Sequence, residues 1–557
     1  MSTYPEIKHD GSSDEEKGHQ HNKIVDSLPV QGDEVQPGGQ RELKRSLKGR
    51  HMQMIAIGGA IGAGFFVGSG GALTTGGPGS LVIAFIIIGL MLLLTMQALA
   101  ELAVMYPVNG AFYSYAVRFI DPSWGFATGW DYAIQWLTVL PFEITAAALT
   151  IKFWPRGAEI NVGVWVTIFL VALCTIQVFG VRGYGEVEFV LAIIKLTATV
   201  GFIILAIIID CGGVPTDDRG YIGARYWHEP GAFRNGFKGF CSVFVTASFA
   251  FGGTELTGLA AAEATNPMRS IPMATKQVFW RISLFYVLGL FLVGLIVPSD
   301  NPGLLHASGA ATAYSPFVIA INLAGIRALP SIFNVVILLA VLSVANSCTY
   351  ASTRTMQALG QTNMGPSFLA YVDKRGRPLW CVLIQIAFGF LAYINEASTG
   401  STIFTWLLAL SGLANFFIWG TICLSHIRFR AGWKAQGHTL DELPYKAFFG
   451  VWGSAVGLSL NIICLVAQFY VALFPVGGAP PDAEAFFESY LAAPLILALY
   501  VFWKLWSRDF SWYVKAKDMD VTTGLRANLD EIREMAEEKR RTAGPKNLPM
   551  KIVRALF

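Results

Sequence analysis

The chain contains about twelve runs of apolar residues, and each run is long enough to cross a lipid bilayer as a helix of about 20 residues. Of the 557 residues, 54% are hydrophobic and only 14% are charged, whereas a soluble domain carries about 25% charged residues. No polar linker divides the runs into separate domains. The sequence therefore predicts an all-α integral membrane protein with about twelve transmembrane helices.

The expected spans lie near residues 52–73, 79–105, 124–152, 162–180, 187–209, 238–262, 277–298, 328–353, 379–395, 402–425, 450–474 and 486–506. The apolar run 314–326 is too short to cross the bilayer, and we expect it to form a helix in an outer loop.

The basic residues of the loops predict the orientation of the chain. A cluster of them precedes the first span: Arg41, Lys44, Arg45, Lys48 and Arg50. Because cytoplasmic loops carry an excess of Lys and Arg, this cluster predicts a cytoplasmic N-terminus. An even number of spans then returns the C-terminus to the cytoplasm. The loops expected on the inner side, in which we place Arg281 and Arg430, also hold more Lys and Arg than the outer loops.

Two spans contain glycine clusters of a kind that helices ordinarily avoid. The first span reads GGAIGAG over residues 58–64, and the sixth span contains Gly252 and Gly253. A glycine inside a helix costs about 1 kcal/mol relative to alanine, so each cluster needs a cause. One cause is close packing of neighbouring helices through small residues. The other is a break in the helix that lines a binding site.

The positions of the two clusters favour a break. The two spans begin the two halves of a five-plus-five arrangement, and glycine-interrupted spans at matching positions indicate the central site of a transporter. A break exposes backbone N–H and C=O groups that lipid cannot satisfy, so these groups must face a cavity. The N–H groups of one break favour a carboxylate, and the carbonyl groups of the other accept hydrogen bonds from an ammonium group. Together the breaks fit a zwitterion.

Further motifs extend along the chain. Residues 180–186 read GVRGYGE, residues 253–256 read GTEL, residues 276–281 read KQVFWR, and residues 405–412 read TWLLALSG. In this order, and with the glycine cluster of the first span, they resemble the fungal amino acid permeases of the amino acid–polyamine–organocation superfamily, general amino acid permeases among them. The resemblance runs from about residue 45 to about residue 526.

The resemblance implies a leucine-transporter-like fold with two inverted five-helix repeats and two extra helices. It also implies uptake of amino acids with protons, by alternating access, at the plasma membrane. On this basis residues 1–50 form a disordered cytoplasmic tail, residues 51–506 a transmembrane transport domain and residues 507–557 a cytoplasmic tail. The repeats cover about 51–209 and 238–425, and the extra helices cover 450–506. The stretch 529–541 has a helical pattern and either docks on the inner face or stays solvated.

The resemblance also assigns residues to the site. The residues expected to contact the substrate are Gly62, Ala63 and Gly64 for its carboxylate, and Phe249, Ala250 and Phe251 for its amine. Phe251 is expected to act as a gate as well. The family often has threonine at the positions of Ala60 and Ala63, so this chain lacks a hydroxyl group near the expected carboxylate.

Ionisable residues inside the spans are functional candidates, because a charge in the membrane costs a few kcal/mol. Five candidates stand out: Glu101, Asp131, Glu143, Lys195 and Glu255. We expect Glu101 to tie neighbouring helices together and Asp131 to lie near the membrane surface. Glu143 follows Pro141 deep in the third span, and we expect it to face the cavity and to influence substrate recognition. Glu255 follows the second break and either orders it or relays a proton.

Lys195 is the candidate for proton coupling. It resembles the lysine that, in proton-coupled relatives, takes the place of a sodium ion between the first and eighth spans. Burial disfavours the charged form of a lysine, whereas nearby carbonyl groups favour it. We therefore expect the protonated side chain to bind near Ile61 and Gly62 and near Ser343, and the neutral side chain to release these groups. Sodium coupling is the alternative.

Two more residues are candidates for the lining of the cavity. Asn346 lies in the eighth span and Trp406 in the tenth, and plain packing is the alternative for Trp406. The sequence lacks several acidic residues around the site, which argues against a strictly cationic cargo. We expect neutral amino acids over a broad range.

Other classes of protein fit the sequence less well. It contains no HExxH or GxSxG motif and no paired Cys–His set, which argues against an enzyme. Its 7 cysteines form no CxxC pair, so we expect no metal or cofactor, and we expect no nucleic-acid partner. A sensor of the same fold, with little net transport, is the alternative to a transporter. Such sensors tend to carry longer tails than the one here.

The polar N-terminal tail suggests regulatory partners. Lys8, Lys17 and Lys23 lie in an acidic segment that we expect to be disordered and cytoplasmic. They are candidate ubiquitin acceptors. A ubiquitin ligase and the endocytic machinery are therefore expected partners, beside the amino acid, protons and the lipid bilayer.

Overall fold

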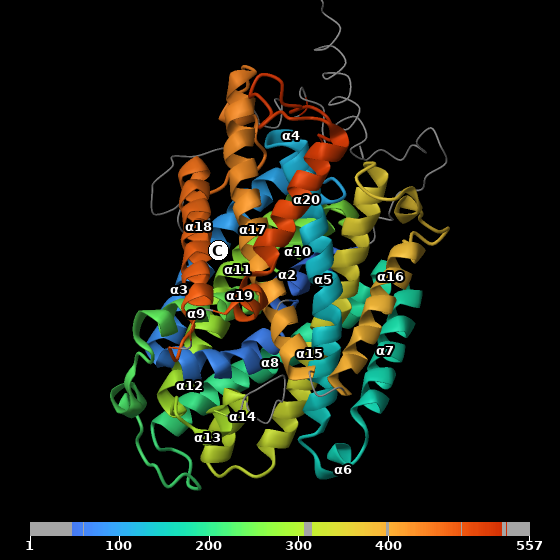
Figure 1. The fold of residues 1–557 in the computed structure, drawn as a ribbon. Helices are drawn as coiled ribbons and strands as arrows, with labels where there is room; N and C mark the ends of the chain where they lie inside the picture. Colours follow the sequence, from blue (N-terminus) through green and yellow to red (C-terminus); the bar gives the residue numbers. More distant parts are fainter. Residues whose placement is uncertain are drawn as a thin grey trace, which may run out of the picture.

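The helices of this chain pack side by side into one bundle. In a computed structural model, the described residues are 47–59, 61–305, 315–396, 400–478, 480, 482–525 and 531. Within these ranges the regular secondary structure is helical, apart from an isolated bridge between Leu47 and Ala264. Figure 1 shows the long helices lying alongside one another.

The helices occur in the regions of the expected spans, but one of them, Ser69–Met105, begins within the first expected span and runs through the second, with a kink at Gly77 (φ +82°). The first third of the chain forms α2 (Gly49–Gly58), a π-helical turn η1 (Gly64–Gly68), α3 (Ser69–Met105), α4 (Ala111–Phe119), α5 (Pro122–Ile151), α6 (Pro155–Ala158), α7 (Val162–Val178) and α8 (Gly180–Asp210). The middle forms η2 (Trp227–Gly231), α9 (Gly236–Phe251), α10 (Leu256–Leu259), η3 (Ala260–Glu263), α11 (Pro267–Trp280), η4 (Arg281–Leu288) and α12 (Gly289–Ile296). The remainder forms α13 (Pro302–Leu305), α14 (Pro316–Leu323), α15 (Leu329–Gln361), η6 (Ser367–Ala370), α16 (Leu379–Gly389), η7 (Phe390–Glu396), α17 (Gly400–Ala435), η8 (Leu440–Glu442), α18 (Gly450–Leu473), α19 (Ala483–Tyr490) and α20 (Ala492–Ser507).

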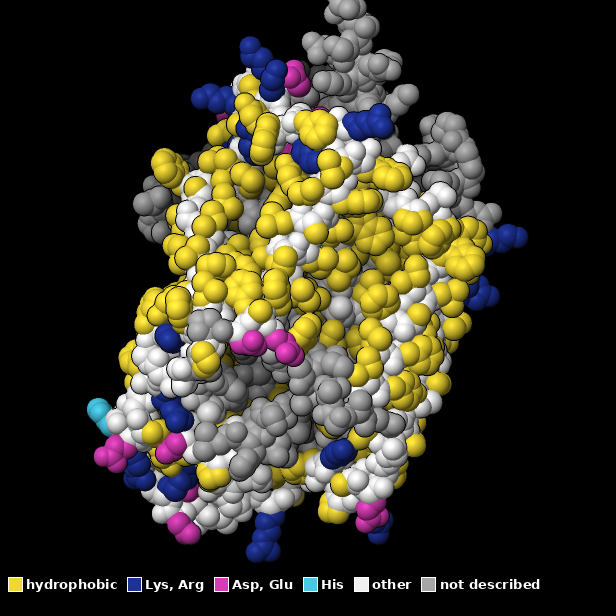
Figure 2. All heavy atoms as spheres, viewed as in Figure 1, with side chains coloured by type: hydrophobic (Ala, Val, Ile, Leu, Met, Phe, Trp, Pro, Cys, Tyr) yellow, Lys and Arg dark blue, Asp and Glu magenta, His cyan; other side chains and the backbone are white. Residues whose placement is uncertain are grey.

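The surface of the bundle is suited to lipid. Within the described residues, 8 helical stretches are long and apolar enough to cross a membrane, and the helices Val162–Val178, Leu379–Ile394 and Ala492–Ser507 are apolar but shorter. On α18, Trp452 is 82% exposed and Val466 is 62% exposed. Figure 2 shows apolar side chains over the middle of the visible face and most charged side chains toward its two ends. Such an apolar belt marks a membrane-embedded surface, which confirms the predicted all-α integral membrane class.

Both glycine clusters interrupt their helices. α2 ends at Gly58, and helical structure resumes only beyond Gly62. α9 ends at Phe251, where Gly252 turns extended (φ −55°, ψ 145°). Gly253 follows with φ +92°, a left-handed conformation that is costly for a residue with a side chain. The two glycine clusters therefore break their helices, and they do not merely allow uninterrupted helices to pack closely.

The two breaks lie against each other in the middle of the bundle. A Cβ added to Gly64 would lie 2.8 Å from Cα of Ala250 and 2.7 Å from Cδ1 of Phe249. This close approach requires glycine at position 64. It brings together two segments that are far apart in the sequence, and the helices α5, α15 and α17 pack around them.

The chain beyond α20 lies along the bundle as far as residue 525. The backbone N–H of Val514 donates to the carbonyl group of Ile120 at 2.8 Å, and the Tyr106 hydroxyl donates to the carbonyl of Val521 at 2.7 Å. The side chains of Val514, Met519 and Val521 are buried. The stretch 529–541, apart from Glu531, lies outside the described residues, as do the tail lysines at positions 8, 17 and 23.

Candidate functional site

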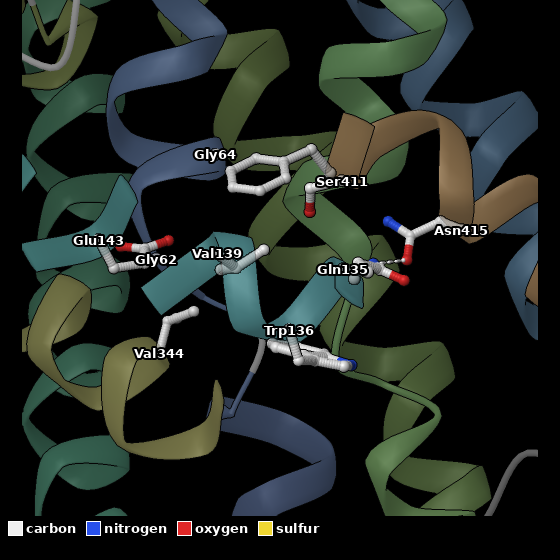
Figure 3. A pocket seen from close by; sticks show the side chains of 11 residues that line it. Gly62, Gly64, Gln135, Trp136, Val139, Glu143, Val344, Ser411 and Asn415 are labelled. Atoms are coloured by element: carbon white, nitrogen blue, oxygen red, sulfur yellow. Dashed lines mark hydrogen bonds between the residues drawn. The ribbon is translucent and has the colours of Figure 1, made fainter. Parts of the chain in front are cut away.

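A cavity lies between the two breaks and three of the long helices. It contains about 310 Å³ of space that no protein atom fills, part of which is open to the surroundings. α5, α15 and α17 supply side chains to its walls, and the two breaks supply backbone. The cavity is lined by Gly62, Gly64, Gln135, Trp136, Val139, Glu143, Phe249, Gly252, Val344, Ser411 and Asn415 (Figure 3).

The first break and Glu143 lie together at one end of the cavity. A Cβ added to Gly62 would lie 3.6 Å from Oε1 of Glu143, and the Ala63 backbone hydrogen-bonds the Glu143 carboxylate. The Glu143 side chain is buried, and its Oε2 has no hydrogen-bond partner among the described groups. The first break therefore already has a carboxylate beside it, and one oxygen of that carboxylate can still accept a hydrogen bond.

The opposite end of the cavity is polar and uncharged. Nε2 of Gln135 donates to Oδ1 of Asn415 at 2.7 Å (Figure 3), and Nδ2 of Asn415 donates to the carbonyl group of Ser248 at 3.0 Å. The Ser411 hydroxyl and the indole N–H of Trp136 are buried without a hydrogen-bond partner among the described groups. This end therefore offers both donors and acceptors to a polar group inside the cavity.

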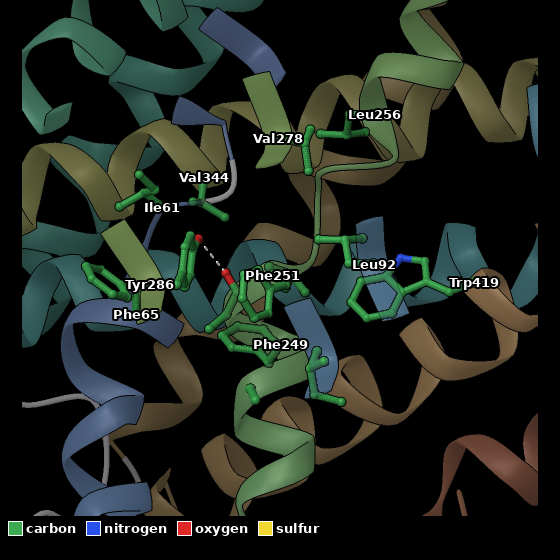
Figure 4. Packing of buried hydrophobic residues seen from close by; sticks show 14 of the residues in the cluster. Ile61, Phe65, Leu92, Phe249, Phe251, Leu256, Val278, Tyr286, Val344 and Trp419 are labelled. Carbon is green, nitrogen blue, oxygen red and sulfur yellow. Dashed lines mark hydrogen bonds between the residues drawn. The ribbon is translucent and has the colours of Figure 1, made fainter. Parts of the chain in front are cut away.

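The three residues expected to offer carbonyl groups from the second break differ in their surroundings. Phe249 lines the cavity. The carbonyl group of Ala250 accepts a hydrogen bond from the Tyr286 hydroxyl at 2.8 Å, as Figure 4 shows. Phe251 is fully buried and stacks on Tyr286, with the ring centroids 4.3 Å apart. Ala250 and Phe251 are not among the lining residues, so in this conformation the Phe251 side chain packs behind the cavity rather than across it.

Glu255 is bound to the backbone of the second break. Its Oε1 accepts hydrogen bonds from the backbone N–H of Gly253 and from the Tyr132 hydroxyl, both at 3.1 Å. Its Oε2 accepts from the indole N–H of Trp419 at 3.2 Å. All three partners are donors directed at a fully buried carboxylate. This arrangement orders the break, which is one of the two roles considered for Glu255 from the sequence.

Arg281 links the two breaks from a position where the sequence suggested a loop. The helix expected at 277–298 begins at Pro267, so Arg281 lies within a continuous helical segment and is fully buried. Its guanidinium donates to the carbonyl group of Ala56 at 2.6 Å and to the Thr254 hydroxyl. These acceptors offset the cost of burying the charge. The expectation that Arg281 lies in an inner loop was therefore wrong.

Lys195 lies fully buried between α8 and α15. Its Nζ donates to the Ser343 hydroxyl at 2.7 Å, and Ser343 is the group of the eighth span expected from the sequence. Nζ also lies 3.4 Å from Oε1 of Glu188, a buried carboxylate that the sequence analysis did not single out. Two signals for Glu188 were present: it lies inside the expected span 187–209, where an ionisable residue is a functional candidate, and it is seven residues from Lys195, which places both on one face of α8.

Asn346 and Trp406 are not among the residues that line the cavity. Oδ1 of Asn346 accepts a hydrogen bond from Gln177 at 3.4 Å, and Nδ2 of Asn346 has no partner among the described groups. Trp406 is half-buried, and its indole N–H also has no partner within the described part of the chain.

The remaining buried acids do not line the cavity. Glu101 accepts two hydrogen bonds from Arg430 of α17, at 2.5 and 2.7 Å, and one from the Ala447 backbone at 2.7 Å, so it ties helices together as expected. Asp131 is 1% exposed, and neither of its oxygens has a hydrogen-bond partner among the described groups. Glu263 pairs with Arg354 at 3.0 Å. No cluster of three or more His, Cys, Asp or Glu residues that could hold a metal ion occurs in the described ranges.

Several lining residues were missed by sequence reasoning. They are Gln135, Trp136, Val139, Gly252, Val344, Ser411 and Asn415. Gln135, Val139 and Glu143 follow one another at intervals of four, so a helical wheel drawn from Glu143 was a signal for the first two. Ser411 lies inside a motif that carried the resemblance. Asn415 gave no such signal, because its partner is 280 residues away in the sequence.

Comparison with known proteins gives a consistent result. Residues 51–512 match the family described as "Amino acid permease". The "Cationic amino acid transporter 1" of Schizosaccharomyces pombe is 52% identical, over 92% of this chain and 86% of its own length. The general amino-acid permease of Saccharomyces cerevisiae is 52% identical, over 90% and 84%. An amino-acid permease of Hypocrea atroviridis is 53% identical, over 89% and 87%.

A solved structure has a similar arrangement of helices. The manganese transporter of Eremococcus coleocola matches with a TM-score of 0.51, over 86% of this chain and 99% of its own, at 13% sequence identity. At this identity the likeness concerns the fold alone. It supports the leucine-transporter-like architecture that the sequence predicts.

Proposed function

Because the chain belongs to the amino acid permease family and is a multi-pass membrane transporter of amino acids, we propose that it couples uptake to protons and works by alternating access. The observation that carries the proposal is the cavity between the two helix breaks. A carboxylate and an ammonium group on one small molecule need backbone donors at one point and acceptors at another. Two adjacent breaks provide both.

The first break is proposed to hold the substrate carboxylate. Gly62, Ala63 and Gly64 belong to this break, and Gly62 and Gly64 line the cavity. Because the Glu143 carboxylate already lies beside Ala63, a second carboxylate there requires Glu143 to turn away or to be protonated. Glu143 is therefore proposed to sense substrate binding directly.

The second break is proposed to bind the substrate amine. The carbonyl group of Phe249 accepts a backbone hydrogen bond from Gly252, and that of Ala250 accepts one from Tyr286. Each carbonyl oxygen has a second lone pair that can accept from an ammonium group. Phe251 is proposed to act as a gate only in another conformation, because here it is packed on Tyr286.

Lys195 is proposed to couple transport to protons, with Glu255 as the second candidate. The hydrogen bond from Lys195 to Ser343 supports the first choice, because it joins α8 to α15 and is stronger from a charged ammonium group than from a neutral amine. Glu255 accepts hydrogen bonds from three donors, which favours a structural role for this carboxylate. Asn346 and Trp406 are proposed to approach the substrate only if the cavity widens during transport.

The proposed cargo is a broad range of neutral amino acids. The end of the cavity at Gln135, Ser411 and Asn415 is polar but uncharged, and Val139 and Val344 add apolar wall. A mixed lining of this kind can receive side chains of different character. Residues in the tails are proposed to lie in the cytoplasm, with the protein at the plasma membrane and its N-terminal lysines open to a ubiquitin ligase.

The test uses the full-length protein in liposomes. We expect labelled neutral amino acids to accumulate when the outside is made acidic, and not when only a sodium gradient is imposed. Accumulation that requires sodium would overturn proton coupling. Binding without accumulation under either gradient would favour the sensor alternative.

A further inference from the structure

We propose that Glu188 is the second half of the proton site, and that Glu188 and Lys195, bridged by Ser343, bind and release the transported proton as one unit. This inference rests on the proposed proton coupling. It adds Glu188 to the proton site and specifies the hydrogen bonds that join the three side chains. In the loaded form the ammonium of Lys195 faces the carboxylate of Glu188. In the unloaded form the pair holds one proton fewer.

Hydrogen bonds join the three side chains to one another in a ring. Nζ of Lys195 donates to Oγ of Ser343 at 2.7 Å, and the Ser343 hydroxyl donates to Oε2 of Glu188 at 2.6 Å. Nζ also lies within 3.4 Å of Oε1 of Glu188. A hydroxyl group has one proton to donate, so Ser343 accepts from the lysine and donates to the carboxylate at the same time. This direction is the one expected for an ammonium and a carboxylate.

The unit of Glu188, Ser343 and Lys195 is buried inside the bundle, where an unbalanced charge is costly. Glu188 and Lys195 lie two helical turns apart on α8, and Ser343 lies on α15, which packs against α8. The side chains of Glu188 and Lys195 are each 0% exposed. An isolated ammonium group in such a place would be strongly disfavoured, whereas an ammonium and a carboxylate together carry no net charge. Glu188 therefore makes it possible to hold the proton on Lys195 inside the membrane.

Other charged groups face the unit from the helices around it. Glu143 on α5 and Arg281 on η4 both act on Lys195, with opposite signs, and Tyr184 on α8 lies near Glu188. Glu143 connects the unit to the cavity, because it lies beside the first break and interacts electrostatically with Lys195. A change in the charge of Glu143 on substrate binding would thus be felt at Lys195. Glu188 is nevertheless the charged group that forms an ion pair with Lys195.

The test measures the pH at which uptake is half-maximal. Full-length protein in liposomes at fixed internal pH is given a mixture of labelled neutral amino acids at a series of external pH values. Glu188→Gln keeps the size of the side chain and removes its charge. Without the carboxylate, protonation of Lys195 needs a higher proton concentration, so the midpoint should move down by about 1–3 pH units. A role of Glu188 in folding alone would lower uptake equally at every pH and leave the midpoint in place.

Glu186→Gln is the matched control. Glu186 lies on the same helix, and its exposed carboxylate binds Arg50 rather than Lys195. It should leave the midpoint unchanged. Ser343→Ala should move the midpoint in the same direction as Glu188→Gln but less far, and Ser343→Thr, which keeps a hydroxyl group, should restore it. If Glu188→Gln fails to reach the membrane, Glu188→Asp replaces it, and its longer distance to Lys195 should give an intermediate shift.

A double substitution tests whether the two residues act together. In a Lys195→Met background, Glu188→Gln should cause no further change in the pH profile, since residues that act as one unit are not additive. An unchanged midpoint in Glu188→Gln, or a separate effect in the Lys195→Met background, would overturn the inference and leave proton coupling intact. If the native protein shows no dependence on external pH, the proposed function itself fails, which is a different result.

Discussion

Buried glutamates in this protein play different parts because their neighbours differ. Glu101 faces the guanidinium of Arg430 and a backbone N–H, and its oxygens are occupied. Glu143 faces a cavity and a helix break, and one of its oxygens has no partner among the described groups. The presence of a glutamate inside a span predicts a structural or functional role for both residues. Only the surroundings show that Glu101 holds helices together and that Glu143 is open to a ligand.

Glu143→Gln should change the choice of substrate more than the stability of the protein. A charge-assisted hydrogen bond lost at the cavity weakens binding by about 1.5–3 kcal/mol, or roughly 10–100-fold in affinity. A competition panel of unlabelled amino acids against one labelled substrate measures this change. Glu101→Gln is the comparison. It should lower the melting temperature, because breaking a buried ion pair costs about 3–5 kcal/mol, and it should keep the ranking of substrates. Equal rankings in both variants would contradict the assignment of Glu143.

Gly64→Ala should abolish uptake while Gly71→Ala leaves it near the native rate. A Cβ at position 64 would lie 2.8 Å from the backbone of Ala250, closer than side chains pack, so the two breaks would have to separate. A Cβ at position 71 would have nothing within 4 Å. Both proteins should reach the membrane, as surface labelling can show. Normal uptake by Gly64→Ala would mean that the contact between the breaks is not needed for transport.

At the scale of helices, the glycine clusters predicted the two breaks. The free-energy cost of a glycine inside a helix depends on the local backbone and not on distant contacts, so it can be judged from the sequence. The end of a helix was harder to place. Lys276 and Arg281 read as the border between an inner loop and the span expected at 277–298, yet α11 and η4 pass through this border without a loop. Arg281 is tolerated there because the carbonyl of Ala56 and the Thr254 hydroxyl, both distant in sequence, accept its protons. Such compensation between segments is invisible to a hydropathy profile.

Glu255→Gln should destabilise the second break at every pH. The substitution replaces one acceptor oxygen by an amide that donates, and it faces donors from Gly253, Tyr132 and Trp419. Leaving a buried donor unsatisfied costs about 1–3 kcal/mol, so the melting temperature in detergent should fall. Uptake should fall by a similar factor across the pH range. A shift of the pH midpoint with unchanged stability would instead assign proton relay to Glu255.

The whole molecule depends on contacts that join distant parts of the chain. Gln135 and Asn415 meet across 280 residues, and Lys195 and Ser343 across 148. The repeat architecture implied by the family brings the corresponding helices together, which is why Ser343 was expected beside Lys195. It does not specify which side chains meet, and for that reason Asn415 and Glu188 were missed. Which side chains meet in the site is determined by how the helices pack against one another, and the order of apolar spans in the sequence does not specify this.

The segment after α20 should stabilise the bundle as a whole, and two truncations can test this. Residues 508–525 cross the ends of α4 and α17: Arg118 donates to the carbonyl of Thr523 at 2.5 Å, and Gln436 donates to that of Met519 at 2.6 Å. Each buried apolar side chain of this segment contributes up to about 1.5–3 kcal/mol, offset in part by the entropy lost on ordering the chain.

Ending the chain after Ser507 should therefore lower the melting temperature in detergent by a few degrees, on the order expected for a loss of one to several kcal/mol. Ending it after Leu525 keeps all of these contacts and should melt as the full-length protein does. If the two truncations melt at the same temperature, the segment rests on the bundle without stabilising it.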